Sequence, residues 1–319
     1  MGVFKYLLGM GKQDEMAGLM PAIERAANGV DPMLKQTSGY PNSYRKSVAS
    51  ALEYARSLAL SVPGPVVVNN ETYARDAFIH ALFPQLNFVR DALCSSRAVQ
   101  EYRQHSPACH EIYALMGMRR VEKTALGMEM SEQVIHGDIP QSVVYFTSHT
   151  IENPAPTEQQ ARDLIAWSFF DKLVSKVAQR IQARKDAKQS LLQEKDLLMA
   201  RLRSADASSR PALQAELSSL LGKLQDTSNS LDFSHYLQDF EAVMLNPQQH
   251  LHLHQVEMAL DSMGVVKNNG DASGVQPVVF NDLVGFDQRD WTVTMVHCKD
   301  MRSESFASRL DNACRTLST

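Results

Sequence analysis

The sequence has few of the features that identify secreted, membrane-spanning and disulfide-bonded proteins. It contains four cysteines, Cys94, Cys109, Cys298 and Cys314, and no two of them form a CxxC pair. It has no run of about 18 apolar residues, which a transmembrane helix would need. Its first residues lack the apolar run and small-residue cleavage site of a secretory signal. Reduced thiols, a cytoplasmic location and no transmembrane segment are therefore the expectation.

The sequence also lacks a large excess of positive or negative charge. The chain carries 32 basic and 36 acidic residues, a net charge of −4, whereas a general nucleic-acid binder concentrates positive charge on one face. Hydrophobic residues make up 44% of the chain and charged residues 21%, which is typical of globular proteins and excludes global disorder. We therefore expect a packed core and no strong nucleic-acid interaction.

The common catalytic motifs are absent. His110 and Glu111 begin a zinc-protease pattern, but Ala114 stands where the second histidine ligand should be. Lys12 ends a stretch that resembles a phosphate-binding loop, yet Gln13 replaces the Ser or Thr that would hold magnesium. No nucleophile-elbow or dinucleotide-binding glycine pattern occurs. These absences favour a protein without catalytic activity, leave the question of an enzyme open, and predict no cofactor.

The strongest positive feature is a long stretch without glycine or proline, residues 157–203. Since helices average about 11–12 residues, this pattern indicates one unusually long helix. After a turn, leucines recur at steps of three, four or seven residues, which is coiled-coil spacing. These are Leu213, Leu217, Leu220, Leu224 and Leu231. We predict an antiparallel helical hairpin over residues 157–232, whose shorter arm packs along the outer half of the long helix.

The inner half of the long helix is strongly apolar. Large side chains crowd it at helical spacing, whereas the outer half has leucines separated by charges. Such a stripe requires a globular body to cover it. The residues predicted to be buried there are Trp167, Phe169, Phe170, Leu173 and Val177.

Segments of β-branched and aromatic residues flank the hairpin in the sequence. Residues 143–147 read Val-Val-Tyr-Phe-Thr, and similar runs occur at 66–68, 277–280 and 291–296. Such runs, bounded by turn-forming residues, predict strands. Short helices are expected before them, including one from Pro107 to Met116, and another over residues 303–317.

These patterns predict an α+β fold that is mostly helical, with an N-terminal helical region and small antiparallel β segments on either side of the helical hairpin. A single sheet built from both β segments is an arrangement that the pattern allows but does not require. The predicted parts are a helical region over 1–116, an antiparallel β segment over 117–156, a projecting hairpin over 157–232 and an α/β region over 233–319.

Three alternating histidines, His250, His252 and His254, form the most conspicuous cluster. A strand would place all three imidazoles on one face, and His297 on a later predicted strand could add a ligand. Imidazole is a common ligand of zinc and iron, so these four residues are candidates for a metal site. Ordinary surface histidines beside a core are the commoner explanation of such a cluster.

The secondary structure of the histidine segment is ambiguous. The pair Asn246-Pro247 is a good helix start, and a helix over 250–263 would place His250, His254 and Glu257 on one face. A regular strand would instead set the histidines and the apolar residues after them on the same side. We therefore expect either a helix or an irregularity at residues 254–256.

A basic stripe lies on the predicted long helix. Arg180, Arg184 and Lys188 recur at every fourth residue and therefore share one face. Such a stripe can bind an acidic partner, but charge runs on coiled coils are usually only solvated. A second basic group, Arg119, Arg120 and Lys123, could hold an anion or pair with local carboxylates.

Two hypotheses of function follow. The leading one is a non-catalytic cytoplasmic interaction or assembly protein, which uses the coiled-coil hairpin to bind a protein partner or a second copy of itself. The alternative is a metal-dependent enzyme or metal-binding protein centred on the histidine segment 250–254, with zinc or iron as the cofactor. The metal content of the purified protein would distinguish them.

Overall fold

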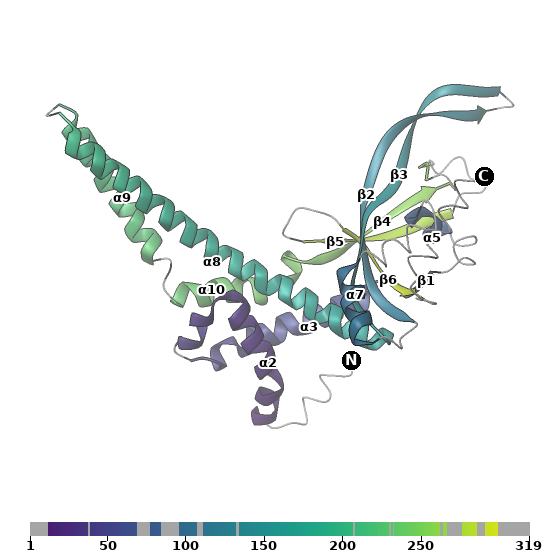
Figure 1. Cartoon of the computed structure of the whole chain (residues 1–319), viewed down its shortest axis with the longest axis horizontal. Helices are drawn as coiled ribbons and strands as arrows, with labels where there is room; N and C mark the ends of the chain where they lie inside the picture. The colour runs from purple at the N-terminus through teal and green to yellow at the C-terminus, as the bar shows by residue number, and fades with distance from the viewer. Residues whose placement is uncertain are drawn as a thin grey trace. The chain divides into compact units, whose positions relative to one another are not determined.

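The fold is α+β, as predicted: helices dominate, and strands flank a long helical hairpin in the sequence (Figure 1). The chain divides into two compact units. Unit 1 comprises residues 1–55 and 167–251, and unit 2 comprises residues 56–166 and 252–319. The computed structural model describes residues 12–37, 39–68, 77–83, 96–106, 111–131, 134–206, 208–229, 231, 233–261, 264–266, 276–285 and 291–298.

Unit 1 is helical. Its short η1 begins at Asp31, whose carboxylate accepts a hydrogen bond from the Met33 N–H at 2.9 Å, while Pro32 supplies the first residue of the turn. This is the usual chemistry of a helix start. The helices that contribute to unit 1 are α2 (Lys12–Val30), η1 (Pro32–Gln36), η2 (Asn42–Tyr44), α3 (Arg45–Ser61), α8 (Glu158–Ser204), α9 (Arg210–Asn229), α10 (Phe233–Met244) and η3 (Pro247–Gln249).

The predicted hairpin is confirmed: α8 forms the long arm and α9 the short one, beside the outer half of α8 (Figure 1). At the turn, the Asp206 carboxylate accepts a hydrogen bond from the Ser209 N–H at 3.2 Å, which starts α9. Leu198 on the long arm and Leu220 and Leu224 on the short arm are buried. The leucine spacing read from the sequence therefore does mark the contact between the arms.

The inner half of α8 forms the core of unit 1. Phe170 and Val177 are fully enclosed, and Phe169 and Leu173 are buried, so the predicted burial is confirmed for these four. Trp167 is half-buried; the Arg25 guanidinium lies 5.1 Å from the centre of its ring.

A close approach of α2 to α8 depends on a glycine. A Cβ atom at Gly29 would lie 2.7 Å from Cγ1 of Val174, which is shorter than side chains tolerate. The helices can therefore pack at this point only because residue 29 has no side chain.

Unit 2 is built on one six-stranded sheet. The strand order is β3-β2-β6-β5-β4 with antiparallel neighbours, and β1 pairs with β6 in parallel. The sheet joins strands that precede the hairpin in the sequence to strands that follow it. The strands are β1 (Val66–Val68), β2 (Ile112–Ser131), β3 (Val134–Ala155), β4 (His252–Leu260), β5 (Gln276–Val284) and β6 (Trp291–Cys298).

Two strands are much longer than the rest. Strands β2 and β3 pair from Tyr113 and Ala155 to Ser131 and Val134, but β2 pairs with β6 only over residues 112–118. Beyond that point β2 and β3 continue as a two-stranded ribbon (Figure 1).

The two edges of the sheet are linked through residues 264–266. The Val144 N–H donates to the Gly264 carbonyl at 2.8 Å, and the Val266 N–H donates to the Ser142 carbonyl at 2.8 Å. Gly264 has a φ of +77°, and a Cβ atom there would lie 2.5 Å from the Val144 carbonyl oxygen. Only glycine fits this position, so the link depends on it.

The core of unit 2 lies between this sheet and two short helices, α5 (Ala77–Leu82) and α7 (Arg97–His105). Phe280 is fully buried and stacks on Phe78 with a ring separation of 5.7 Å. The buried side chains that meet there include Ile79, Leu82, Val99, Met116, Met118, Val144, Phe146, Val278 and Phe280.

The expected helix from Pro107 to Met116 is wrong, because β2 begins at Ile112. Ile112, Ala114 and Met116 are buried on one face and Leu115 on the other, and all four pair with β6, so this apolar run belongs to a strand covered on both faces. A short apolar run of this kind cannot be assigned from its period alone. The helix expected over residues 303–317 lies outside the described residues, as do Cys94, Cys109 and Cys314.

Among the helices described, none combines the length and the apolar character that a membrane crossing requires.

Candidate functional site

The histidine segment forms a regular strand. Strand β4 pairs with β5 without a shift of register from His252 to Leu260. Both expectations for this segment, a helix over 250–263 and an irregularity at 254–256, are therefore wrong. His252 and His254 are exposed while Leu260 on the same side is buried, so this face passes from solvent to core along the strand. Because the exposure of this face changes along the strand, the histidines can face solvent and the later apolar residues the core without a bulge between them.

The candidate metal ligands lie in different surroundings. His250 follows η3 in unit 1, where burial lowers its pKa and the positive charges of Arg180 and Lys176 lower it further. The same charges oppose the binding of a metal cation. His252 and His254 belong to β4 of unit 2.

His297, the fourth candidate, is already engaged within unit 2. Its ring stacks on Tyr113 at a centroid distance of 4.1 Å, and its Nε2 lies 3.0 Å from a carboxylate oxygen of Glu111. Across the described part of the chain, no group of three or more His, Cys, Asp or Glu residues could hold a metal ion. The metal-dependent alternative therefore gains no site from the described residues.

The basic stripe of α8 contacts other parts of unit 1. Arg184 forms a bidentate ion pair with Asp239 of α10, at 2.7 and 3.0 Å, and Lys188 donates to the Ser228 hydroxyl of α9 at 3.1 Å. Arg180 lies close enough to His250 to lower its pKa. Arg184 and Lys188 thus brace α8 against its neighbours within unit 1, and a partner surface on this stripe stays a prediction.

The second basic group is also partly engaged. The Arg120 guanidinium lies 2.7 Å from the buried carboxylate of Asp282, which accepts a further hydrogen bond from the Thr292 hydroxyl at 2.6 Å. Lys123 lies 5.4 Å from the centre of the Tyr145 ring. Arg120 therefore pairs with carboxylates, as one of its two predicted roles required.

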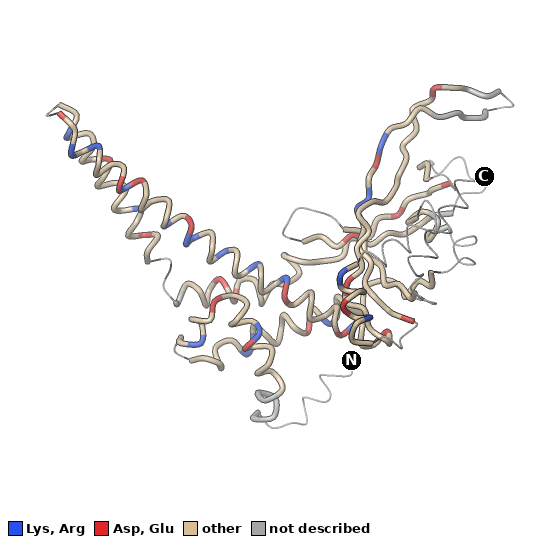
Figure 2. The backbone as a smooth tube through the Cα atoms, in the orientation of Figure 1, with Lys and Arg blue, Asp and Glu red and all other residues tan. Residues whose placement is uncertain are grey.

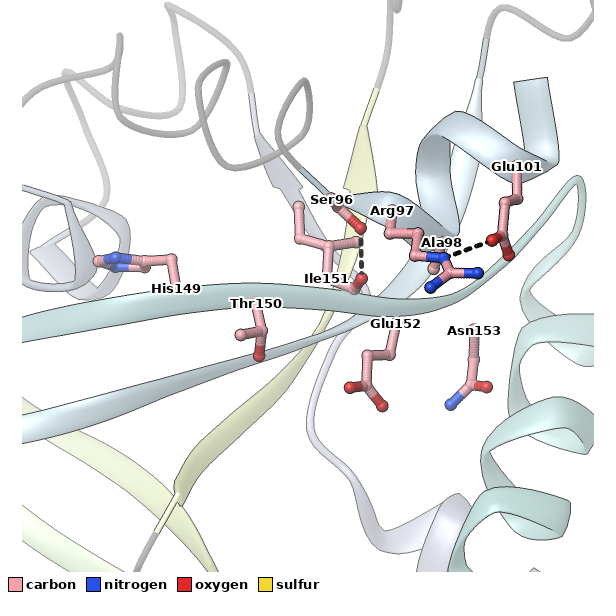
Figure 3. A pocket seen from close by; sticks show the side chains of 9 residues that line it. All are labelled: Ser96, Arg97, Ala98, Glu101, His149, Thr150, Ile151, Glu152 and Asn153. Atoms are coloured by element: carbon pink, nitrogen blue, oxygen red, sulfur yellow. Dashed lines mark hydrogen bonds and ion pairs between the residues drawn. The ribbon is translucent and has the colours of Figure 1, made fainter. Parts of the chain in front are cut away.

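A pocket of about 500 Å³ lies in unit 2 between the start of α7 and the end of β3 (Figure 3). Its lining includes a hydroxyl and an imidazole, Ser96 and His149, together with the carboxylates of Glu101 and Glu152. The Ser96 hydroxyl donates to the Ile151 carbonyl at 2.7 Å, and Nε2 of His149 lies 2.9 Å from the Leu82 carbonyl. Both groups are thus hydrogen-bonded to the backbone, and the His149 ring points away from Arg97 in Figure 3. Ser96 and His149 therefore do not form a nucleophile–base pair with each other.

The surroundings of His149 predict a pH dependence of stability. Burial lowers the pKa of His149 below its ordinary value of 6.5, and the hydrogen bond with the Leu82 carbonyl opposes this only in part. As the pH falls through about 6.5, His149 becomes protonated in the unfolded chain but stays neutral in the folded chain. Protonation therefore favours the unfolded state, and the free energy of unfolding falls until the pH passes the lower pKa of the folded state. We expect the free energy of unfolding to decrease between about pH 7 and that value.

Urea titrations of the wild type and of His149→Gln over this pH range would measure the effect. Glutamine retains a donor for the Leu82 carbonyl but does not titrate, so the variant should lose part of the pH dependence. His105→Gln, at an exposed position of α7, is the matched control and should keep it. An unchanged pH profile in His149→Gln would contradict the prediction.

The hairpin presents the largest organised surface of unit 1. Between residues 181 and 204, the side chains that are buried or half-buried follow a regular pattern. Apart from Lys185, they recur at alternating steps of three and four residues. The series on α8 is Ile181, Arg184, Lys188, Leu191, Lys195, Leu198 and Leu202, and that on α9 is Leu213, Leu217, Leu220, Leu224 and Thr227. These are the a and d positions of a two-helix coiled coil. The Lys188–Ser228 hydrogen bond sets their register.

This register gives the hairpin two different sides. Because the arms are antiparallel, residues that follow a d position on either arm lie on the same side. At the inner end of that side are Lys185 and Ser228. Farther out on it are Leu192, Met199 and Leu221, with exposed fractions of 38%, 39% and 49%, and the uncharged Gln214. We call these four residues the apolar flank.

The opposite side of the hairpin carries charges. The register sets Glu194 across from Lys223 and Arg201 across from Glu216, and all four are exposed. We call these residues the charged flank; the mixture of acidic and basic residues along both arms is visible in Figure 2. Sequence reasoning missed the apolar flank, although a full heptad assignment from the leucine spacing would have found it.

Comparison with known proteins adds no name to these features. No known protein family, no curated protein and no solved structure matches this chain.

Proposed function

We propose that this chain is a non-catalytic interaction or assembly protein of the cytoplasm and that its helical hairpin binds a protein partner. The observation that carries the proposal is the apolar flank, where Leu192, Met199 and Leu221 are all more than a third exposed on one side of a two-helix element. Single exposed apolar residues are normal on protein surfaces, but a group of them on a rigid element is typical of a binding surface. The cytoplasmic location is proposed because the cysteine spacing is not that of a disulfide framework.

The construction of the hairpin supports this role. Its base is braced by ion pairs, Arg184 with Asp239 and Lys185 with Asp31 at 2.8 Å. Its outer part has a leucine seam that holds the arms together. A surface held in one conformation before binding loses little conformational entropy when a partner binds. Because one flank is apolar and the other charged, a partner would bind one side of the hairpin in preference to the other.

The proposal predicts site-specific cross-linking. A photoreactive benzoylphenylalanine at position 192, on the apolar flank, should give discrete cross-linked products in the native host. The matched control is position 164, which lies on the same helix α8 with an exposed fraction of 44% but precedes the part of α8 that pairs with α9. Electrophoresis and mass spectrometry of the products would identify the partner. Equal products from both positions, or none from position 192, would contradict the proposed function.

A further inference from the structure

The partner that fits the apolar flank is another copy of the same chain, and we infer that two hairpins pack flank against flank into an antiparallel four-helix bundle. This inference rests on the proposed function and specifies its partner. A two-helix coiled coil with an apolar side is half of such a bundle, since four-helix bundles bury a seam on each pair of helices and a second surface between the pairs. The structure supplies the first seam and leaves the second surface exposed.

The apolar flank is complementary to itself. A two-fold dimer brings the same patch of each copy together, so a patch with uncompensated charge would repel its own image. The register places Leu192 across from Leu221 and Met199 across from Gln214, and none of these side chains is charged. When two copies meet about a two-fold axis near Leu192 and Leu221, leucine therefore packs on leucine.

The charges on this side are paired within the chain. The nearest is Asp196, which lies between Leu192 and Met199 on the helix, is 75% exposed and lies 3.3 Å from the Lys195 ammonium. Lys185 lies one heptad before Leu192 towards the base of the hairpin, and its ammonium donates to the Asp31 carboxylate at 2.8 Å. That hydrogen bond also raises the pKa of Lys185, so the pair stays ionised together. A second copy would therefore meet two ion pairs, Asp196 with Lys195 beside the flank and Lys185 with Asp31 at its inner end.

A charged partner would bind more favourably to the charged flank than to the apolar flank. The charged flank offers Glu194, Arg201, Glu216 and Lys223 for recognition by opposite charges. The apolar flank offers only side-chain shape and apolar area, which an identical surface matches by symmetry. A second copy is thus the occupant that the composition of this side favours.

The size of the surface sets the expected strength of the dimer. The paired arms cover about 20 residues, roughly 30 Å of helix, and two helices side by side are roughly 20 Å wide. Each copy would bury on the order of 600 Å², so the dimer would bury roughly 1,200 Å², at the lower end of specific interfaces. We therefore expect a reversible dimer with a dissociation constant on the order of micromolar.

Sedimentation equilibrium of the purified full chain tests the inference. The wild type should dimerise reversibly as its concentration rises through the micromolar range, and the double variant Leu192→Glu, Leu221→Glu should dimerise at least about 100-fold more weakly, because four carboxylates would meet at the two-fold axis. Leu197→Glu is the matched control: Leu197 is exposed to 65% but lies off the apolar flank, so its dimerisation should be unchanged. Far-UV circular dichroism and thermal melts would verify that each variant folds.

A charge exchange makes the test specific to packing of flank on flank. Leu192→Lys, Leu221→Lys should also be monomeric, but mixing it with the glutamate variant should restore a mixed dimer. A monomeric wild type at about 100 μM, well above the expected dissociation constant, would overturn the inference. Equal weakening by Leu197→Glu, or no mixed dimer from folded variants, would overturn it as well.

The two proposals fail separately. A monomeric wild type that cross-links from position 192 to a different protein would overturn the inference and support the proposed function. A monomeric wild type that gives no product from position 192 would overturn both.

Discussion

Replacing Phe170 with alanine is expected to lower the free energy of unfolding by about 3–5 kcal/mol. Phe170 is 0% exposed, and its ring meets the edge of Trp167 at a centroid distance of 5.8 Å. Its neighbours on α8, Phe169 and Leu173, are buried beside it and cannot move to fill the space. The cost thus combines the lost burial of the ring with the cavity that it leaves.

A denaturant titration followed by far-UV circular dichroism would measure the change. Because the chain has two compact units, a separate transition for the helical unit should be sought. Leu197→Ala is the control, since Leu197 lies on the same helix with 65% of its surface exposed and should change stability by less than about 0.5 kcal/mol. A loss below about 1 kcal/mol for Phe170→Ala would show that the ring is not enclosed.

Replacing Arg162 with methionine is expected to cost about 2–4 kcal/mol in the stability of unit 2. Its guanidinium donates to four backbone carbonyls where α3 ends and the following turn begins: Ala59 at 2.9 Å, Leu60 at 3.3 Å, Val62 at 3.2 Å and Gly64 at 3.1 Å. Its Nε also pairs with Glu158 at 2.8 Å. The last carbonyls of a helix have no partner within the helix, so this one side chain satisfies groups that would otherwise be left unpaired.

The chemistry of arginine explains why no other residue would serve. Its planar group presents several N–H donors in fixed directions, whereas lysine has a single ammonium, so Arg162→Lys should lose most of the same stability. Methionine keeps much of the apolar stem and removes the donors. With 10% of its side chain exposed, Arg162 is also shielded from the solvent that would replace its hydrogen bonds.

Arg97 provides the control for this prediction. It forms an ion pair with Glu101 at 2.6 Å at the same spacing of four residues, but 90% of its side chain is exposed. Arg97→Met should therefore leave stability essentially unchanged, because solvent screens this exposed ion pair. Thermal and urea unfolding of the three variants would measure these effects. Equal effects at the two arginines would mean that the carbonyl contacts of Arg162 contribute nothing.

Features that depend on near neighbours in the chain could be predicted from the sequence. The run of 157–203 without glycine or proline predicted the long helix, and the leucine spacing predicted the hairpin and its seam. The aromatic stripe around Phe170 predicted burial. The β-branched runs predicted β1, β5 and β6 for the same reason, because strand preference and turn residues are local properties.

Features that depend on distant partners could not be predicted in this way. The Pro107–Met116 run became part of a strand because β6 lies beside it, and the basic residues of α8 became internal braces because Asp239 and Ser228 lie within reach. The carbonyls that Arg162 binds precede it by 98 to 103 residues.

The histidine segment shows the same limit in a single strand. The sequence of β4 does not say which end of the strand other parts of the chain cover. In the structure His252 is exposed at one end and Leu260 is buried at the other. The long helix, its hairpin and the side chains that the hairpin buries follow from the period of one segment, so the sequence was enough to predict them. Which charges are internal and which flank of the hairpin is left apolar and exposed depend on what the rest of the chain places nearby, so these features emerged only from the folded chain.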